Sequence, residues 1–169
     1  MKKIDLSTKE KKDKLEKVAL FQSLSPEELE LIAQITYALK FSKDEIIIKE
    51  GEIGDCCYIL YLGTVKVLKK TFAKEQYAVA QIDAEGNAFF GEMALIDKDA
   101  RTATIQAVSE VITLVLEASS FENLAVNNFR IGYHILKAVA KKLIERLKLA
   151  NSDIATLFGA LEEEIEQEG

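Results

Sequence analysis

The chain has 169 residues, of which 49% are hydrophobic and 30% are charged, and its formal net charge at pH 7 is −6. This balance is typical of one globular domain with an appended helix, and it excludes a disordered or fibrous chain. No apolar run reaches the roughly 20 residues that cross a bilayer, and the charged start lacks a secretory leader, so we expect a cytoplasmic protein with no membrane contact.

The first zone of the chain, residues 8–40, is predicted to be helical, and its beginning overlaps a charged N-terminal segment, residues 1–17. The clearest start signal is a capping box, in which Ser25 is the N-cap, Pro26 takes the first helical position and Glu28 completes the box. Three apolar residues then recur on one helical face: Leu29, Ile32 and Ala33. This pattern predicts a short amphipathic helix packed on a core.

The second zone, residues 41–118, changes to short β-branched and aromatic runs separated by Gly, Asp, Asn or Ser. No long helix separates these runs, so a parallel doubly wound sheet is excluded and a barrel or rolled sandwich is favoured. Cys56 and Cys57 are adjacent and have no other cysteine to pair with, so we expect reduced thiols. After the first runs, strands are expected at Tyr77–Ile82, Ala103–Ala107 and Val111–Leu116.

The third zone, from about residue 119, is helical again and carries apolar residues at alternating steps of four and three. This heptad seam predicts a homodimer through a coiled coil, and the alternative is an amphipathic helix lying on its own domain. Residues 151–153 favour a new helix start, and Gly159 weakens the seam. The seam consists of Leu136, Ala140, Leu143, Leu147, Ala150, Ile154, Leu157 and Leu161.

The stretch FFGEMALIDKDARTAT, residues 89–104, lies between two expected strands and carries separated opposite charges. Gly91 allows close backbone approach, and one turn of helix after it presents N–H groups to an anion. Arg101 supplies a planar, permanently charged fork for a phosphate. A carboxylate repels phosphate, so Glu92 is expected to accept a hydrogen bond from a sugar hydroxyl. The stretch therefore predicts a ligand with a phosphate and a ribose-like hydroxyl.

At these residues the chain resembles the cyclic nucleotide-binding domains of catabolite-activator-type regulators, cyclic-nucleotide-dependent kinases and cyclic-nucleotide-gated channels. The glycine-punctuated segment from Glu50 to Val67 looks like the turns and strands of the family's β-roll. Phe90–Leu95 with Ala100–Thr104 looks like its phosphate-binding cassette, although many members have Pro where this chain has Ala100. The resemblance covers residues 18–150.

The resemblance implies an α+β fold: an antiparallel, jelly-roll-like β-roll flanked by N-terminal helices and a long C-terminal helix. The nucleotide-binding β-roll with its N-terminal helix would span residues 18–125, and the C-terminal lid and dimerisation helix with its acidic tail would span residues 126–169. The implied function is a regulatory module that binds cAMP or cGMP and signals to a downstream protein partner through movement of this helix.

The same resemblance implies roles for single residues. Glu92 would bind the ribose 2′-hydroxyl and Arg101 the cyclic phosphate, while Thr102 fits either base and leaves cAMP and cGMP open. The cradle would be completed by backbone groups of Phe90, Gly91, Met93, Ala94, Thr102 and Ala103. Contacts to the base are expected from Val67 and Ala80 in the roll and from Lys142 or Arg146 in the C-terminal helix.

Other functional classes fit the sequence less well. A cupin-type enzyme needs several converging metal ligands, whereas this chain has one histidine, so we expect no catalytic residues, no metal and no cofactor other than the nucleotide. The scattered Lys and Arg of an acidic chain predict no nucleic-acid binding by this chain alone. The alternatives are a degenerate β-roll that serves as a dimer or partner scaffold without nucleotide, and the ligand-sensing fragment of a transcription regulator. For Glu92 and Arg101 the alternative to ligand binding is a mutual salt bridge that closes the loop.

Overall fold

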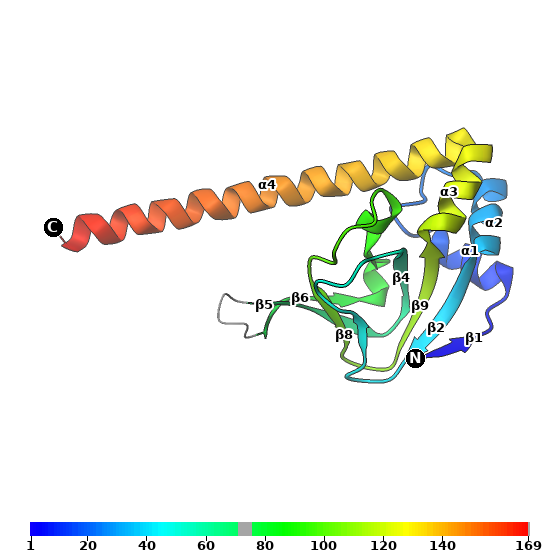
Figure 1. The fold of residues 1–169 in the computed structure, drawn as a ribbon, viewed down its shortest axis with the longest axis horizontal. Coiled ribbons are helices and arrows are strands. Elements are labelled where there is room, and N and C mark those ends of the chain that lie inside the picture. Colours follow the sequence, from blue (N-terminus) through cyan, green and yellow to red (C-terminus); the bar gives the residue numbers. More distant parts are fainter. Residues whose placement is uncertain (71–75, 169) are drawn as a thin grey trace.

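A computed structural model describes residues 1–70 and 76–168, and Figure 1 shows a rolled sheet with helices at one end and one long helix that projects away from it. The helices are α1 (Thr8–Leu15), α2 (Pro26–Ile35), α3 (Ala118–Asn127) and α4 (Phe129–Glu168), with 3₁₀ turns η1 (Ala84–Gly86) and η2 (Glu92–Leu95). The strands are β1 (Lys2–Ile4), β2 (Thr36–Phe41), β3 (Ile46–Ile48), β4 (Cys56–Leu62), β5 (Thr64–Lys70), β6 (Gln76–Asp83), β7 (Phe89–Phe90), β8 (Thr104–Ala107) and β9 (Val111–Glu117).

The strands form two antiparallel sheets that face each other. One sheet has the order β1-β2-β9-β4-β7 and the other has the order β3-β8-β5-β6. Neighbouring strands that are distant in sequence, such as β2 and β9, close the roll. The predicted α+β fold, an antiparallel β-roll flanked by helices, is confirmed.

Two apolar clusters form the core. One lies between the sheets and includes Phe41, Leu60 and Val115, which are all nearly inaccessible to solvent. The other joins the helices to the outer face of the five-stranded sheet, where Phe21 and Ile135 are completely buried. The start of α4 is therefore part of the domain core.

The N-terminal part of the chain differs from the sequence prediction in two places. The prediction of helix for residues 36–40 was wrong, because Thr36–Phe41 forms β2 and pairs with β9 along its whole length. Pairing with β9 and the burial of Ala38, Leu39 and Phe41 override the helical pattern that precedes them. The charged segment 1–17 contains a short strand, since Lys2–Ile4 pairs with β2 as an edge strand. The capping box of Ser25 and Glu28 is present as predicted.

The third zone divides at Asn128 into α3 and α4, and α4 then runs through residues 151–153 and Gly159 without a break. Its first turns bury Ile131, Ile135 and Val139. In Figure 1 its second half extends beyond the roll, and every residue from Leu147 to Phe158 is exposed. A helix of 40 residues is about 60 Å long, so the domain covers only its beginning. Over the described parts of the chain, no helix combines the length and the apolar character needed to span a membrane.

Candidate functional site

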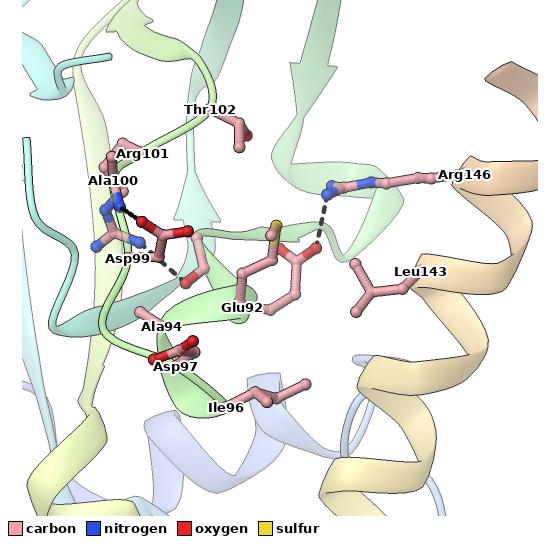
Figure 2. A pocket seen from close by; sticks show the side chains of 12 residues that line it. Glu92, Ala94, Ile96, Asp97, Asp99, Ala100, Arg101, Thr102, Leu143 and Arg146 are labelled. Atoms are coloured by element: carbon pink, nitrogen blue, oxygen red, sulfur yellow. Dashed lines mark hydrogen bonds and ion pairs between the residues drawn. The ribbon is translucent and has the colours of Figure 1, made fainter. Parts of the chain in front are cut away.

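A cavity of about 180 Å³ lies where the η2 turn, the loop before β8 and α4 meet. Figure 2 shows the Glu92 carboxylate facing Arg146 of α4, while Arg101 lies on the loop that leads to β8. The cavity is lined by Gly91, Glu92, Met93, Ala94, Ile96, Asp97, Asp99, Ala100, Arg101, Thr102, Leu143 and Arg146. Distant parts of the sequence thus contribute both cationic and anionic groups to one enclosed space.

The η2 turn forms the floor of the cavity. Gly91 has φ +73°, a left-handed conformation that other residues adopt only with strain, and it starts the turn. The Ala94 N–H donates to the Gly91 carbonyl at 3.2 Å and the Ile96 N–H donates to the Met93 carbonyl at 2.9 Å. This compact turn carries Glu92 inward, so that only 1% of the residue is exposed.

The buried Glu92 carboxylate is the most unusual group in the cavity. Arg146 Nη1 lies 2.8 Å from Glu92 Oε1, which makes an ion pair between α4 and the η2 turn. The approach does not have hydrogen-bond geometry, and Oε1 accepts no hydrogen bond from the described part of the chain. No ion pair joins Glu92 to Arg101 among the described residues, so the mutual salt bridge considered as their alternative role is not formed. The ion pair with Arg146 offsets part of the cost of burying this carboxylate, and the remaining acceptor capacity of Oε1 is open to a ligand donor.

Arg101 is held by backbone carbonyl groups rather than by a carboxylate. Its Nη1 donates to the Gly91 carbonyl at 3.0 Å, and its Nη2 donates to the Cys56 carbonyl at 2.7 Å. Two glycines make room for this side chain: a Cβ at Gly54 would lie 2.5 Å from Arg101 Cζ, and a Cβ at Gly91 would lie 2.7 Å from Nη1. The glycines of both sequence motifs therefore serve the position of one arginine.

The loop that carries Arg101 is fixed to the first glycine-rich segment. The Arg101 N–H donates to the Glu52 carbonyl at 2.8 Å, and the Gly51 N–H donates to the Arg101 carbonyl at 2.9 Å. The Gly54 N–H donates to the Asp99 carbonyl at 3.1 Å, next to an isolated bridge between Ile53 and Ala100. The glycine-rich segment and the phosphate-binding cassette were predicted to belong to one family. In the structure, the glycine-rich segment holds the Arg101 loop of the cassette in place through these backbone hydrogen bonds.

The α4 wall is held by side chains. Lys142 Nζ donates to the Phe89 carbonyl at 2.8 Å and lies 3.6 Å from the centroid of the Phe89 ring. Burial lowers the pKa of Lys142, and the nearby Glu92 charge opposes that shift. Burial also raises the pKa of Cys57, and the Glu92 charge adds to it, so this free thiol stays protonated near neutral pH.

The residues expected from the sequence fall into two groups. Those that line the cavity are Gly91, Glu92, Met93, Ala94, Arg101, Thr102 and Arg146, and those outside its lining are Phe90, Ala103, Val67, Ala80 and Lys142. Phe90 is buried in the core between the sheets. Val67 and Ala80 face each other across β5 and β6, and Lys142 contacts Phe89 instead.

Five lining residues were not predicted to contact a ligand: Ile96, Asp97, Asp99, Ala100 and Leu143. The first four lie inside the segment already singled out, so their contribution follows from its closed shape. Leu143 belongs to the heptad seam, and its position beside Arg146 depends on how α4 docks. Its spacing in the sequence predicted a place in the helix–helix seam and did not indicate that it lines the cavity.

The family can now be decided from sequence matches. A family model described as the cyclic nucleotide-binding domain matches residues 38–128, which is more than half of the chain. The chain belongs to the cyclic nucleotide-binding domain family. The predicted family is therefore confirmed, and with it the prediction of a regulatory module of the cyclic nucleotide-binding type. The matched residues run from within β2 through α3 and include the whole η2 turn, but not α4.

Named relatives are kinase subunits and kinases. The chain is 34% identical over 110 residues to a cAMP-dependent protein kinase regulatory subunit of Emericella nidulans, covering 65% of this chain and 26% of the relative. It is 34% identical over 116 residues to cGMP-dependent protein kinase 2 of Homo sapiens, covering 68% of this chain and 15% of the relative. The chain thus spans about a quarter or less of the length of these relatives.

Solved structures share the fold. The catabolite activator protein of Thermus thermophilus has a TM-score of 0.73 at 24% identity, covering 82% of this chain and 62% of that protein. A cyclic nucleotide-binding domain from Methylobacillus flagellatus has a TM-score of 0.72 at 26% identity, covering 83% of this chain and 78% of that domain. The regulatory domain of Toxoplasma gondii PKA with cAMP has a TM-score of 0.71 at 24% identity, covering 82% and 50%.

Proposed function

We propose that this chain binds cAMP or cGMP in the cavity between η2 and α4, and that nucleotide binding changes the position of α4. The observation that carries the proposal is the buried Glu92 carboxylate, whose Oε1 accepts no hydrogen bond in the described structure although Arg101 holds a cationic site in the same cavity. A cyclic nucleotide complements both groups, because it has a ribose hydroxyl donor for the carboxylate and an anionic phosphate for the guanidinium.

Charge complementarity assigns the two ends of the nucleotide. Asp97 and Asp99 also line the cavity, so a phosphate is favoured only close to the Arg101 guanidinium. Arginine has five N–H donors, and the bonds to Gly91 and Cys56 leave others for phosphate oxygens. We therefore assign the phosphate to Arg101 and the ribose 2′-hydroxyl to Glu92.

Arg146 provides the link to α4. In the structure its guanidinium neutralises Glu92, and a ribose hydroxyl bound to the same carboxylate competes for that place. Nucleotide binding therefore favours arrangements of α4 in which Arg146 has moved, which is a shift between pre-existing populations. Since a ligand shifts such an equilibrium only through different affinities for the two states, the exchange at Glu92 is the source of the signal.

The remaining parts of the proposal concern the base and the partners. Thr102 and Leu143 line the cavity on opposite walls and are the candidates for base contacts in the bound state, in which Arg146 has moved. Thr102 suits either purine, so cAMP and cGMP are both candidate ligands. The chain acts as a non-enzymatic, cytoplasmic regulator that forms a homodimer through α4 and is read by a protein partner.

Calorimetric titration with cAMP and with cGMP tests the proposal. Wild type should bind at least one of them, and Arg101→Ala should bind about tenfold to a hundredfold more weakly, because a charged hydrogen-bonding group is lost. Arg130→Ala is the matched control, since Arg130 pairs with Glu28 far from the cavity.

A second variant separates binding from folding. Glu92→Gln leaves Arg101 and its carbonyl partners in place, so a weakened nucleotide affinity with an unchanged melting temperature would support direct contact. If wild type binds neither nucleotide below about 1 mM, or if Arg101→Ala binds as well as wild type, the proposal is wrong.

A further inference from the structure

The exposed seam of α4 points to one kind of partner. We propose that α4 pairs with α4 of a second copy in antiparallel orientation, with Leu147 of each copy facing Ala150 of the other. This inference rests on the homodimer part of the proposed function and does not require nucleotide binding. It specifies the direction, register and facing residues of the interface.

Most of the seam lacks cover within the described part of one chain, and the exception is Leu143, which packs against the core and lines the cavity. Leu147, Ile154 and Leu157 are 60%, 51% and 64% exposed, and Leu136 is 40% exposed. These residues follow one another along α4 on the same stripe, which extends far beyond the roll in Figure 1. An apolar stripe of this length on a solvent-facing helix is the pattern of a helix–helix interface.

The spacing of the seam residues is compatible with both a parallel and an antiparallel helix pair, but the sizes of their side chains fit only the antiparallel pair. The steps of four and three read the same from either end, so an antiparallel pair places each of the eight seam positions opposite another seam position. In that pair Ala140 faces Leu157 and Ala150 faces Leu147, so each small residue meets a large one. In a parallel pair each alanine faces its own copy and leaves a gap, whereas large-to-small packing fills the interface.

The charges along α4 favour the same direction. Residues 129–150 contain six Lys or Arg and one Glu, a net charge of +5, whereas residues 151–168 contain six acidic residues and no Lys or Arg, a net charge of −6. A parallel pair places like charges side by side along both halves, which is unfavourable. An antiparallel pair places the basic half of each helix beside the acidic half of the other.

An apolar groove beside the start of α4 can accommodate the C-terminal end of α4 from the second copy. This groove, between η2, α3 and α4, has a volume of about 760 Å³ and contains the exposed side chains of Val126, Phe129 and Tyr133. It also contains Leu136, the first seam residue, so the groove continues the seam. In the proposed register, position 161 of the second copy lies opposite Leu136, and the helix end reaches the groove.

The register also brings the second copy close to the nucleotide site. Asp153 of the second copy lies about 3 Å from Arg146 along the helix axis and on the same edge of the interface. Arg146 pairs with Glu92 in the free chain, so the two carboxylates compete for one guanidinium. Release of Arg146 from Glu92 would then strengthen the interface.

Cysteine cross-linking tests the direction. Ala140→Cys and Leu157→Cys are prepared separately in the full chain, and wild type is the control because Cys56 and Cys57 are buried. Residue 140 lies about 26 Å from residue 140 of the other copy in an antiparallel pair, so neither variant should cross-link alone under mild oxidation. Mixing the two should give a covalent dimer. Efficient cross-linking of either variant with itself would overturn the antiparallel proposal.

A substitution in the seam provides an independent test, because it should change the strength of dimerisation in opposite senses in an antiparallel and in a parallel pair. Ala150→Leu meets Leu147 in an antiparallel pair and should weaken dimerisation in sedimentation by about fivefold or more. In a parallel pair the same change fills the gap between two alanines and strengthens the dimer. A wild-type chain that is monomeric at tens of micromolar also overturns the proposal. Calorimetry reports nucleotide binding separately, so failure of one proposal is distinguishable from failure of the other.

Discussion

The two walls of the cavity are held in different ways. The η2 turn and the Arg101 loop are fixed by backbone hydrogen bonds to each other and to the glycine-rich segment before β4. The α4 wall contacts them through side chains, with Lys142 on Phe89 and Arg146 on Glu92. Backbone ladders change conformation only at the cost of several hydrogen bonds, whereas one side chain changes partner easily. We therefore expect the wall formed by η2 and the Arg101 loop to keep its conformation when a ligand binds, and the α4 wall to move.

The rigid wall is tested most strongly at Gly54. Gly54→Ala places a methyl group 2.5 Å from Arg101 Cζ, so the guanidinium must leave its carbonyl partners while the backbone remains in place. We expect nucleotide affinity to fall about tenfold or more, measured by calorimetry. Gly86→Ala is the matched control, because no heavy atom lies within 4 Å of its added Cβ. Wild-type affinity in Gly54→Ala would show that the position of Arg101 is unimportant.

The movable wall is tested at Arg146. Arg146→Ala removes the competitor for Glu92, so we expect cyclic nucleotide affinity to rise about threefold. The effect is modest because half of the Arg146 side chain is exposed. The measurement is the same calorimetric titration, with Arg130→Ala beside it. A clear fall in affinity would instead show that Arg146 contacts the bound nucleotide, and it would contradict the proposal that Arg146 competes with the nucleotide for Glu92.

The smallest expected effect is the contribution of Lys142 to the pH dependence of the unfolding free energy. Burial lowers its pKa in the folded chain below the ordinary value of 10.5, so the unfolded chain binds more protons between the two values. The unfolding free energy therefore rises with pH through this window and falls as pH drops towards the folded pKa. Denaturant unfolding at both ends of the window should show this rise in wild type and a smaller one in Lys142→Met. Identical slopes would contradict a perturbed Lys142.

Much of the site follows from local patterns. Glu92 and Arg101 were predicted from their chemistry, and both line the cavity, because each role needs a particular functional group in one short segment. Val67 and Ala80 were proposed as base contacts and lie outside the cavity lining, since an apolar strand residue carries no local signal of what it faces. Residues 36–40 were assigned to helix because their pairing with β9 depends on a strand more than 70 residues away.

The sequence by itself determined the family, the strand-rich centre, the capped helix at Ser25 and the seam of α4, because these depend on spacing and residue type within short segments. The tertiary structure decided the partner of each charge. Arg101 binds two backbone carbonyls, and Glu92 meets Arg146 from a helix that begins far along the chain. Such pairings depend on how α4 docks against the roll, and docking is a property of the packed core around Ile135 and Val139.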